Sequence, residues 1–219
     1  MQQGSNLRRL NIGCGATPTP GWVNYDGSIG VHLAALPALV SIMTKFGLLS
    51  NMQNHLISVI KQEGIKYANA IKRIPEPNHS ADVLYTCHML EHLDRREAEL
   101  FLKEARRVLI PNGIIRIAVP DLKYHIENYL KDQDADAFIR NIQLANNRPI
   151  GLVEKLKHFI VGERHHLWMY DGVSLCRLLL ESGFRNPRVL GAGQTTIPNP
   201  GCLDLAERVP ESVFVEAKN

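Results

Sequence analysis

The sequence predicts an α/β protein with a doubly wound, mostly parallel sheet. Strand-like and helix-like segments alternate through the middle of the chain, an order typical of parallel sheets. The first predicted strand runs into the glycine turn Gly13-Cys14-Gly15, and the second ends at Asp26. The chain has 219 residues, so we expect one domain that spans residues 1–219.

Seven short segments are predicted to be strands. The earlier ones are almost continuously apolar, which suits strands that are buried on both faces of a parallel sheet. Pro18 and Pro20 prevent a long helix after the glycine turn, so the second strand follows the first closely. The segments are residues 9–12, 22–25, 65–70, 81–87, 114–119, 188–191 and 212–216.

Helices are predicted where apolar residues recur every three or four positions after a capping residue. Asp94 followed by Glu97 resembles a capping box. Asp171 is placed to cap another helix, which Gly183 would end. The predicted helices outside the first third of the chain are residues 95–109, 122–131, 135–144 and 172–182.

A helical insertion is expected between the second and third strands. Helical spacing of apolar residues predicts two or three helices within residues 31–63, with breaks at Pro37 and around residues 47–51. We treat residues 29–63 as the insertion. It could be a lid, a dimer surface or a membrane-contacting element, and we favour a lid.

Four loops are expected to meet at one edge of the sheet, because ligands of such sheets bind at the carboxyl ends of the strands. These loops are the glycine turn, Asp26, Cys87-His88 and Pro120-Asp121. Glycines permit positive φ and close approach of a ligand, and a carboxylate at the second strand can accept ribose hydroxyls. This pattern indicates a cofactor that contains a nucleoside.

Several classes of function are disfavoured by the residues. A dinucleotide fingerprint requires a third glycine where Pro18 stands, and a P-loop requires a Lys-Ser or Lys-Thr pair after its glycines. The net charge of +3 does not indicate a nucleic-acid partner.

A zinc site is the main alternative. His88-Met89-Leu90-Glu91-His92 matches the H-x-x-E-H pattern of inverted zinc peptidases. That chemistry requires one continuous helix, whereas His88 directly follows a strand and Asp94 begins the helix proper. We therefore expect no metal, and a zinc-dependent hydrolase remains the alternative.

The ordered set of motifs resembles the class I S-adenosylmethionine (SAM)-dependent methyltransferases of the methyltransferase type 11 group. More narrowly, it is similar to small predicted methyltransferases found with bacterial cell-surface polysaccharide genes. The matching stretches are LNIGCG (10–15), GWVNYD (21–26), ADVLYTCHMLEHL (81–93), RVLIPNGIIRIAVPDL (107–122), HLWMYD (166–171), LLLESGF (178–184) and SVFVEAK (212–218).

The resemblance implies SAM as cofactor, with S-adenosylhomocysteine (SAH) as product, on a seven-stranded Rossmann-like sheet. It implies that the glycine turn wraps the methionine and ribose, that Asp26 holds the ribose, and that the end of the third strand lies near the adenine. The implied cofactor residues are Asn11, Ile12, Gly13, Cys14, Gly15, Asp26, Gly27, Asn69, Ala70, Cys87 and His88.

The expected reaction is in-line transfer of a methyl group to a small-molecule, saccharide or lipid-linked acceptor, at oxygen. A base could take the acceptor proton, and histidine suits neutral pH. His88, His92 and Glu91 are the leading candidates, with Asp121 and His166 behind them. Glu91 and His92 could instead only cap or pack the next helix, and a non-catalytic SAM-binding module is a further alternative.

The remaining expectations concern the exposure of single side chains, the cellular setting and the oligomeric state. The pair His165-His166 is expected to face solvent. Trp168 and Tyr170 could line the acceptor pocket, but Trp168 is rather expected in the core beside the Asp171 cap. Four widely spaced cysteines indicate reduced thiols in a cytoplasmic protein, here taken as bacterial. We expect no transmembrane span, and a homodimer is one option.

Overall fold

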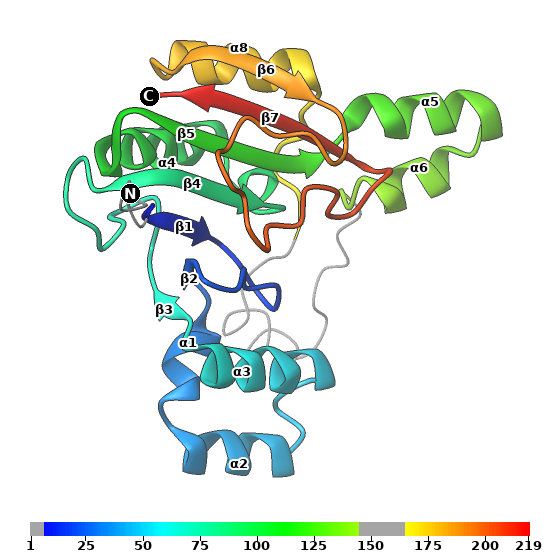
Figure 1. Ribbon diagram of the computed structural model, residues 1–219. Helices are drawn as coiled ribbons and strands as arrows, with labels where there is room; N and C mark the ends of the chain where they lie inside the picture. Colours follow the sequence, from blue (N-terminus) through cyan, green and yellow to red (C-terminus); the bar gives the residue numbers. More distant parts are fainter. Residues whose placement is uncertain (1–6, 145–164) are drawn as a thin grey trace.

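The structure is a computed structural model that describes residues 7–144 and 165–219, and seven strands form its sheet (Figure 1). The order across the sheet is β3-β2-β1-β4-β5-β7-β6. β7 runs antiparallel to β5 and β6, and the other pairings are parallel. The strands are β1 (Arg9–Ile12), β2 (Val23–Asp26), β3 (Lys66–Tyr67), β4 (Ala81–Cys87), β5 (Leu109–Pro120), β6 (Arg185–Leu190) and β7 (Ser212–Lys218). The predicted fold class is confirmed.

The helices begin at the capping residues that the sequence indicates. Asp94 accepts the backbone N–H of Glu97, whose side chain accepts the N–H of Asp94 in return. Asp171 and Ser174 form a second reciprocal cap. The helices are α1 (Ile29–Ala34), α2 (Pro37–Lys45), α3 (Asn51–Glu63), α4 (Arg95–Val108), α5 (Leu122–Asp132), α6 (Ala135–Asn141) and α8 (Gly172–Glu181), with a 3₁₀ turn, η1, over Leu90–His92.

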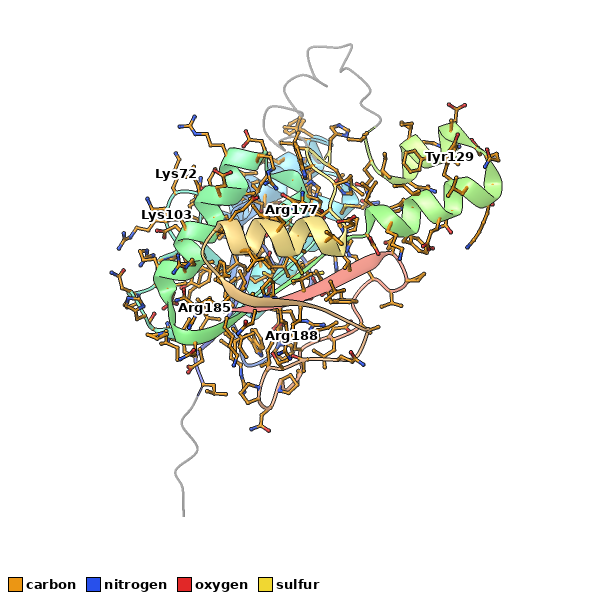
Figure 2. The ribbon with its side chains drawn as sticks, turned by 90° about the horizontal axis from the view of Figure 1, so that it is seen from above. Lys72, Lys103, Tyr129, Arg177, Arg185 and Arg188 are labelled. Carbon is orange, nitrogen blue, oxygen red and sulfur yellow. The ribbon has the colours of Figure 1, made fainter. Side chains whose placement is uncertain are left out.

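The two faces of the sheet are covered differently. One face packs against the apolar sides of α4 and α8, through residues such as Phe101 and Leu179. The other face packs against the segment between β6 and β7, through Ile197 and Leu203. Seen from above, α8 lies over β6 and β7, while α5 and α6 extend beyond the sheet near Tyr129 (Figure 2). The edge of the sheet at which the parallel strands end, here called the carboxyl edge, lies between the insertion and the α5–α6 pair (Figure 1).

The region between β2 and β3 is helical, as predicted. Its helices are separated at Pro37 and again between Lys45 and Asn51. α3 packs through Ile57 and Ile60, whereas α2 has no buried residue. Within the described residues, no helix is long and apolar enough to cross a membrane.

The strand boundaries differ most from the sequence predictions at β3, β5 and β6, and β6 begins at Arg185 rather than at residue 188. β3 has only two residues because the chain turns directly after it, where the N–H groups of Lys72 and Arg73 donate to Asn69 O. β5 begins at Leu109, before the Pro-Asn-Gly stop signal, because Leu109 pairs with Ala81 across the sheet. A local turn therefore ends β3, whereas long-range pairing sets the start of β5.

Candidate active site

The glycine turn is fastened to the end of β2. Gly13 N and Cys14 N both donate to Tyr25 O, at 2.8 and 3.1 Å. The Asp26 carboxylate accepts Gly15 N at 2.9 Å and Ser28 N at 2.8 Å. Asp26 therefore joins the turn to the start of α1 while it remains beside the carboxyl ends of β1 and β2.

A cavity of about 190 Å³ lies at this edge. Five of the predicted cofactor residues line it: Ile12, Gly13, Gly27, Asn69 and Ala70. Small-molecule sites are typically about 300–1,000 Å³, so the cavity is narrow.

Met89, which sequence reasoning missed, also lines the cavity, together with Ala68, Ile71 and Leu93. Gly13 has φ +71°, and a Cβ atom there would lie 2.5 Å from Met89 Cγ. Only glycine fits this close approach, since the side chain opposite already fills the space.

The other predicted cofactor residues lie around the cavity rather than in its lining. Asn11 is buried and donates to Thr19 Oγ1 at 3.1 Å, which holds the short loop before β2. Cys14 packs against Ile60 and Ile65. Burial, and then the nearby Asp26 carboxylate, raise the pKa of the Cys14 thiol to about 12. Gly15 and Asp26 shape the turn, and Cys87 and His88 lie at the end of β4.

His88 is held in a strained and fully bonded position. Its φ is +48°, uncommon for a residue with a side chain, and such strain is often found at functional sites. Nε2 lies 2.8 Å from Ser212 Oγ, and Nδ1 lies 3.0 Å from Arg208 Nη1, so Nδ1 accepts from the guanidinium. Burial, followed by the Arg208 charge, lowers the pKa of His88 to about 3. His88 is therefore neutral at pH 7 and a weak base.

Glu91 is buried in η1, with 1% of its surface exposed. Neither carboxyl oxygen has a hydrogen-bond partner among the described residues. Burial raises the pKa of Glu91 to about 8, against smaller opposing effects that include the Arg208 charge. The Oε1 atom lies 3.5 Å from His88 Nδ1 and 3.9 Å from His92 Nε2.

His92 is the most accessible of the predicted catalytic side chains, with 34% of its side chain exposed. Its Nδ1 lies 3.1 Å from the carbonyl of His165, which assigns the ring proton to Nδ1. Nε2, the other ring nitrogen, lies 3.9 Å from Glu91 Oε1.

His166 lies beside Glu91 and His92, contrary to the expectation that it faces solvent. Leu167 N and Trp168 N donate to Glu91 O at 2.7 and 3.1 Å, which ties this segment to η1. His166 is 4% exposed, its Nε2 lies 3.9 Å from Glu91 Oε1, and its ring centre lies 5.2 Å from that of His92. Burial, and then His92, lower the pKa of His166 to about 4.

The other polar and aromatic candidates have local structural roles. Asp121 caps α5 by accepting Lys123 N, and burial raises its pKa. Asp171 caps α8, as expected. The expectation that Trp168 lies in the core is wrong, because Trp168 is 44% exposed. The guanidinium carbon of Arg95 lies over the Trp168 ring, 5.4 Å from the ring centre.

The H-x-x-E-H segment does not lie on one helix. His88 precedes η1 in a left-handed conformation, and the 3₁₀ turn covers only Leu90–His92. His88 and His92 therefore do not face one another across a helical turn, as an inverted zinc peptidase requires.

The fold and the cavity define a class of protein. A seven-stranded, mostly parallel sheet with a glycine turn after β1 and a carboxylate after β2 is typical of Rossmann-like enzymes that bind a nucleoside cofactor. Residues 10–117 match the type 11 family of the methyltransferase domain. The match covers just under half of the chain, so the chain is similar to this family, and it is a SAM-dependent methyltransferase.

Solved structures share the fold at low sequence identity. A SAM-dependent methyltransferase from Thermotoga maritima is 14% identical, with a TM-score of 0.52 over 96% of this chain and 81% of its own. Another from Methanosarcina mazei is 17% identical, with a TM-score of 0.52 over 97% and 92%. No curated protein matches the sequence.

Proposed function

We propose that this methyltransferase transfers the methyl group of SAM to a hydroxyl oxygen of a small-molecule or saccharide acceptor, free or lipid-linked. The observation that carries this proposal is the double use of residues 88–93. Met89 and Leu93 line the cofactor cavity, whereas Glu91 and His92 lie in the polar cluster with His88. One short segment thus joins the cofactor cavity to groups that can accept a proton.

The residues around the cavity fit SAM. Gly13 and Gly27 both line the cavity, and a Cβ at either position would meet a neighbour, Met89 Cγ at 2.5 Å or Ala68 O at 3.0 Å. We assign the ribose to Asp26 and the adenine to the Asn69–Ala70 side. When bound, SAM supplies an activated methyl group on a sulfonium, and the electrons of the broken C–S bond stay on sulfur.

The chain itself has to align the acceptor and receive its proton. Alignment contributes about 7–11 kcal/mol in well-oriented systems. His92 is the favoured base because 34% of its side chain is exposed, whereas the side chains of His88 and Glu91 are 6% and 1% exposed. His88 is neutral and bonded on both nitrogens, so it is better suited to orient the end of β4. Glu91, beside the imidazoles of His88 and His92, is better suited to orient those two rings.

The insertion is proposed to close over the acceptor. Apolar side chains on and beside α2 are exposed, including Leu39, Ile42 and Phe46, with Phe46 at 72%. An apolar lid would suit a lipid-linked acceptor, and the same surface would suit a homodimer. The four free cysteines support a reducing, cytoplasmic setting. We further propose that the protein is bacterial and modifies cell-surface polysaccharides or their precursors.

The test is transfer of a labelled methyl group from SAM to a panel of nucleotide sugars, glycolipids and small phenols. We expect one acceptor class to be labelled at oxygen, and His92→Gln to lower kcat about 10²–10⁴-fold with little change in SAH affinity. His79→Asn is the control, because His79 bonds Leu109 O at the opposite edge of the sheet.

Two outcomes would contradict the proposal. SAH binding with no transfer to any hydroxyl acceptor would favour the non-catalytic binding module. Transfer that proceeds equally fast in His92→Gln would remove His92 as the base while leaving methyl transfer intact.

A further inference from the structure

The helix α2 carries a stripe of exposed apolar side chains. Leu39 and Ile42 of α2 and Phe46 directly after it are all exposed. Because residues three or four positions apart lie on one side of a helix, these three form a single stripe, which we call the outer face of α2. The helix packs on the rest of the insertion through a different face, where Val40 and Met43 lie against a buried apolar cluster.

An apolar outer face is unusual on a surface helix. The exposed side of such a helix is normally polar, and contiguous exposed apolar side chains mark contact with a protein or a membrane. Leu36 and Leu48, just before and after α2, are exposed as well. We therefore expect the outer face to be covered by a partner when the protein functions.

The charge of the same region favours an anionic partner. Residues 27–62 contain no Asp or Glu. Over residues 27–75, five cationic side chains against the single carboxylate Glu63 give a net charge of +4, whereas the whole chain carries +3. The insertion and the strand after it are thus basic, and the rest of the chain is slightly acidic. The five cationic residues are all exposed: Lys45, Lys61, Lys66, Lys72 and Arg73.

Two other roles explain the outer face less well. No residue of α2 lines the cofactor cavity, and α3 lies between α2 and the strands (Figure 1). Closure over the acceptor therefore does not account for this face. In a symmetric pair of chains the same surface meets itself, so contact through α2 would bring two Lys45 side chains together, with no carboxylate from residues 27–62 to pair with them.

We propose that the insertion rests on the surface of an anionic phospholipid bilayer, with the outer face of α2 among the headgroups. Lys45 ends α2 and Lys61 lies in the last turn of α3, so both can reach lipid phosphates. Amphipathic helices bind such surfaces through buried apolar area together with the attraction of Lys and Arg to anionic lipids.

A bilayer at α2 would select the lipid-linked acceptors from the classes proposed above. Gly27 and Ala68, just before and after the insertion in the chain, both line the cofactor cavity. A membrane contact of the insertion therefore lies on an element that begins and ends at the cavity. This selection rests on the proposed methyl transfer, whereas membrane binding does not.

The test is co-sedimentation of the full-length protein with vesicles of phosphatidylglycerol and phosphatidylcholine, compared with phosphatidylcholine alone. We expect binding to the anionic vesicles that weakens as salt is added. Ile42→Ser/Phe46→Ser should weaken binding at least about tenfold, because it removes the two most exposed apolar side chains of the outer face. Lys45→Gln should weaken it about fivefold.

Val173→Ser/Leu180→Ser is the matched control and should bind as the wild type does. Val173 and Leu180 are 67% and 55% exposed, against 72% and 53% for Phe46 and Ile42. They belong to α8, at the other end of the molecule (Figure 1). Unchanged SAH affinity in each variant shows that it is folded.

Several results would overturn the proposal. Absence of vesicle binding, or equal binding by Ile42→Ser/Phe46→Ser and the wild type, removes the membrane contact. Equal binding to neutral and anionic vesicles overturns the lipid class. Self-association that is lost in Ile42→Ser/Phe46→Ser, without vesicle binding, would make the outer face an interface between copies.

The same measurements separate this proposal from the proposed function. Vesicle binding without methyl transfer to any acceptor overturns the proposed function and supports the membrane contact. Methyl transfer without vesicle binding does the reverse. Vesicle binding with transfer to water-soluble acceptors alone overturns the selection of lipid-linked acceptors.

Discussion

Replacement of Gly13 by alanine tests whether the glycine turn is shaped by the side chain opposite it. Gly13 has φ +71°, so an alanine there is strained whatever the surrounding space. Its Cβ would also lie 2.5 Å from Met89 Cγ and 2.9 Å from Met89 Cβ. The second distance matters, because a Cβ atom cannot move without a shift of its backbone.

The expected cost can be built from these two contributions. Left-handed backbone costs an ordinary residue about 1–2 kcal/mol, and overfilling a packed site costs about 1–3 kcal/mol. Gly13→Ala should therefore lose roughly 2–5 kcal/mol of unfolding free energy. Gly21→Ala is the matched control: Gly21 has φ +78° but no heavy atom within 4 Å of the added Cβ, so it should lose only the first contribution.

The assays are denaturant unfolding and calorimetry with SAH. We expect Gly13→Ala to weaken SAH binding at least about tenfold, which is about 1.4 kcal/mol, and Gly21→Ala to leave it unchanged. Adding Met89→Ala to Gly13→Ala removes the 2.5 Å contact and should recover part of the lost stability. Equal destabilisation by the two glycine variants, with SAH affinity unaffected in both, would refute the reasoning.

Three further predictions concern stability. The Glu91 pKa of about 8 against an ordinary 4.5 means that, between these pH values, the folded state keeps a proton that the unfolded chain releases. The unfolding free energy should then fall by at most about 5 kcal/mol as pH rises from 4.5 to 8. In urea titrations Glu91→Gln should flatten this slope, and an unchanged slope would contradict the raised pKa of Glu91. Arg116→Met should lower the unfolding free energy measured in urea by about 3–5 kcal/mol, because it leaves Glu216, the partner of Arg116 at 2.7 Å, as a buried unpaired charge. A decrease below about 1 kcal/mol would show that the ion pair is not needed for stability. Asp94→Ala should cost about 1 kcal/mol through loss of the α4 cap. Glu99→Ala, at an exposed acidic residue of the same helix, is the control, and identical thermal unfolding of the two variants would argue against the cap.

The parts of the fold that depend on neighbouring residues could be predicted from the sequence. The reciprocal caps at Asp94 and Asp171 and the exact extent of β4 follow from short local patterns. The breaks in the insertion follow from Pro37 and the glycine-containing stretch 46–50 before α3. These features need no knowledge of the rest of the chain.

The features that sequence reasoning missed depend on contacts between distant segments. His166 is buried because Leu167 and Trp168 bond to the carbonyl of Glu91, and an adjacent histidine pair carries no sign of that pairing. Met89 faces Gly13 because of the tight turn into η1, whereas its neighbours Leu90 and Glu91 are buried elsewhere. The residue types near the site were predictable, but which of them meet was not.

Calorimetric titration of the protein with SAH, compared between the wild type and Asp26→Ala, tests the central claim most directly. The carboxylate of Asp26 lies between the glycine turn and α1, where we assign the ribose. Hydrogen bonds to a charged group contribute about 1.5–3 kcal/mol each, so we expect one SAH per chain and at least tenfold weaker binding in the variant. Asp82→Ala, which removes a carboxylate that accepts Arg8 N, should bind as the wild type does. Absence of SAH binding, or equal affinity in Asp26→Ala, would contradict the account.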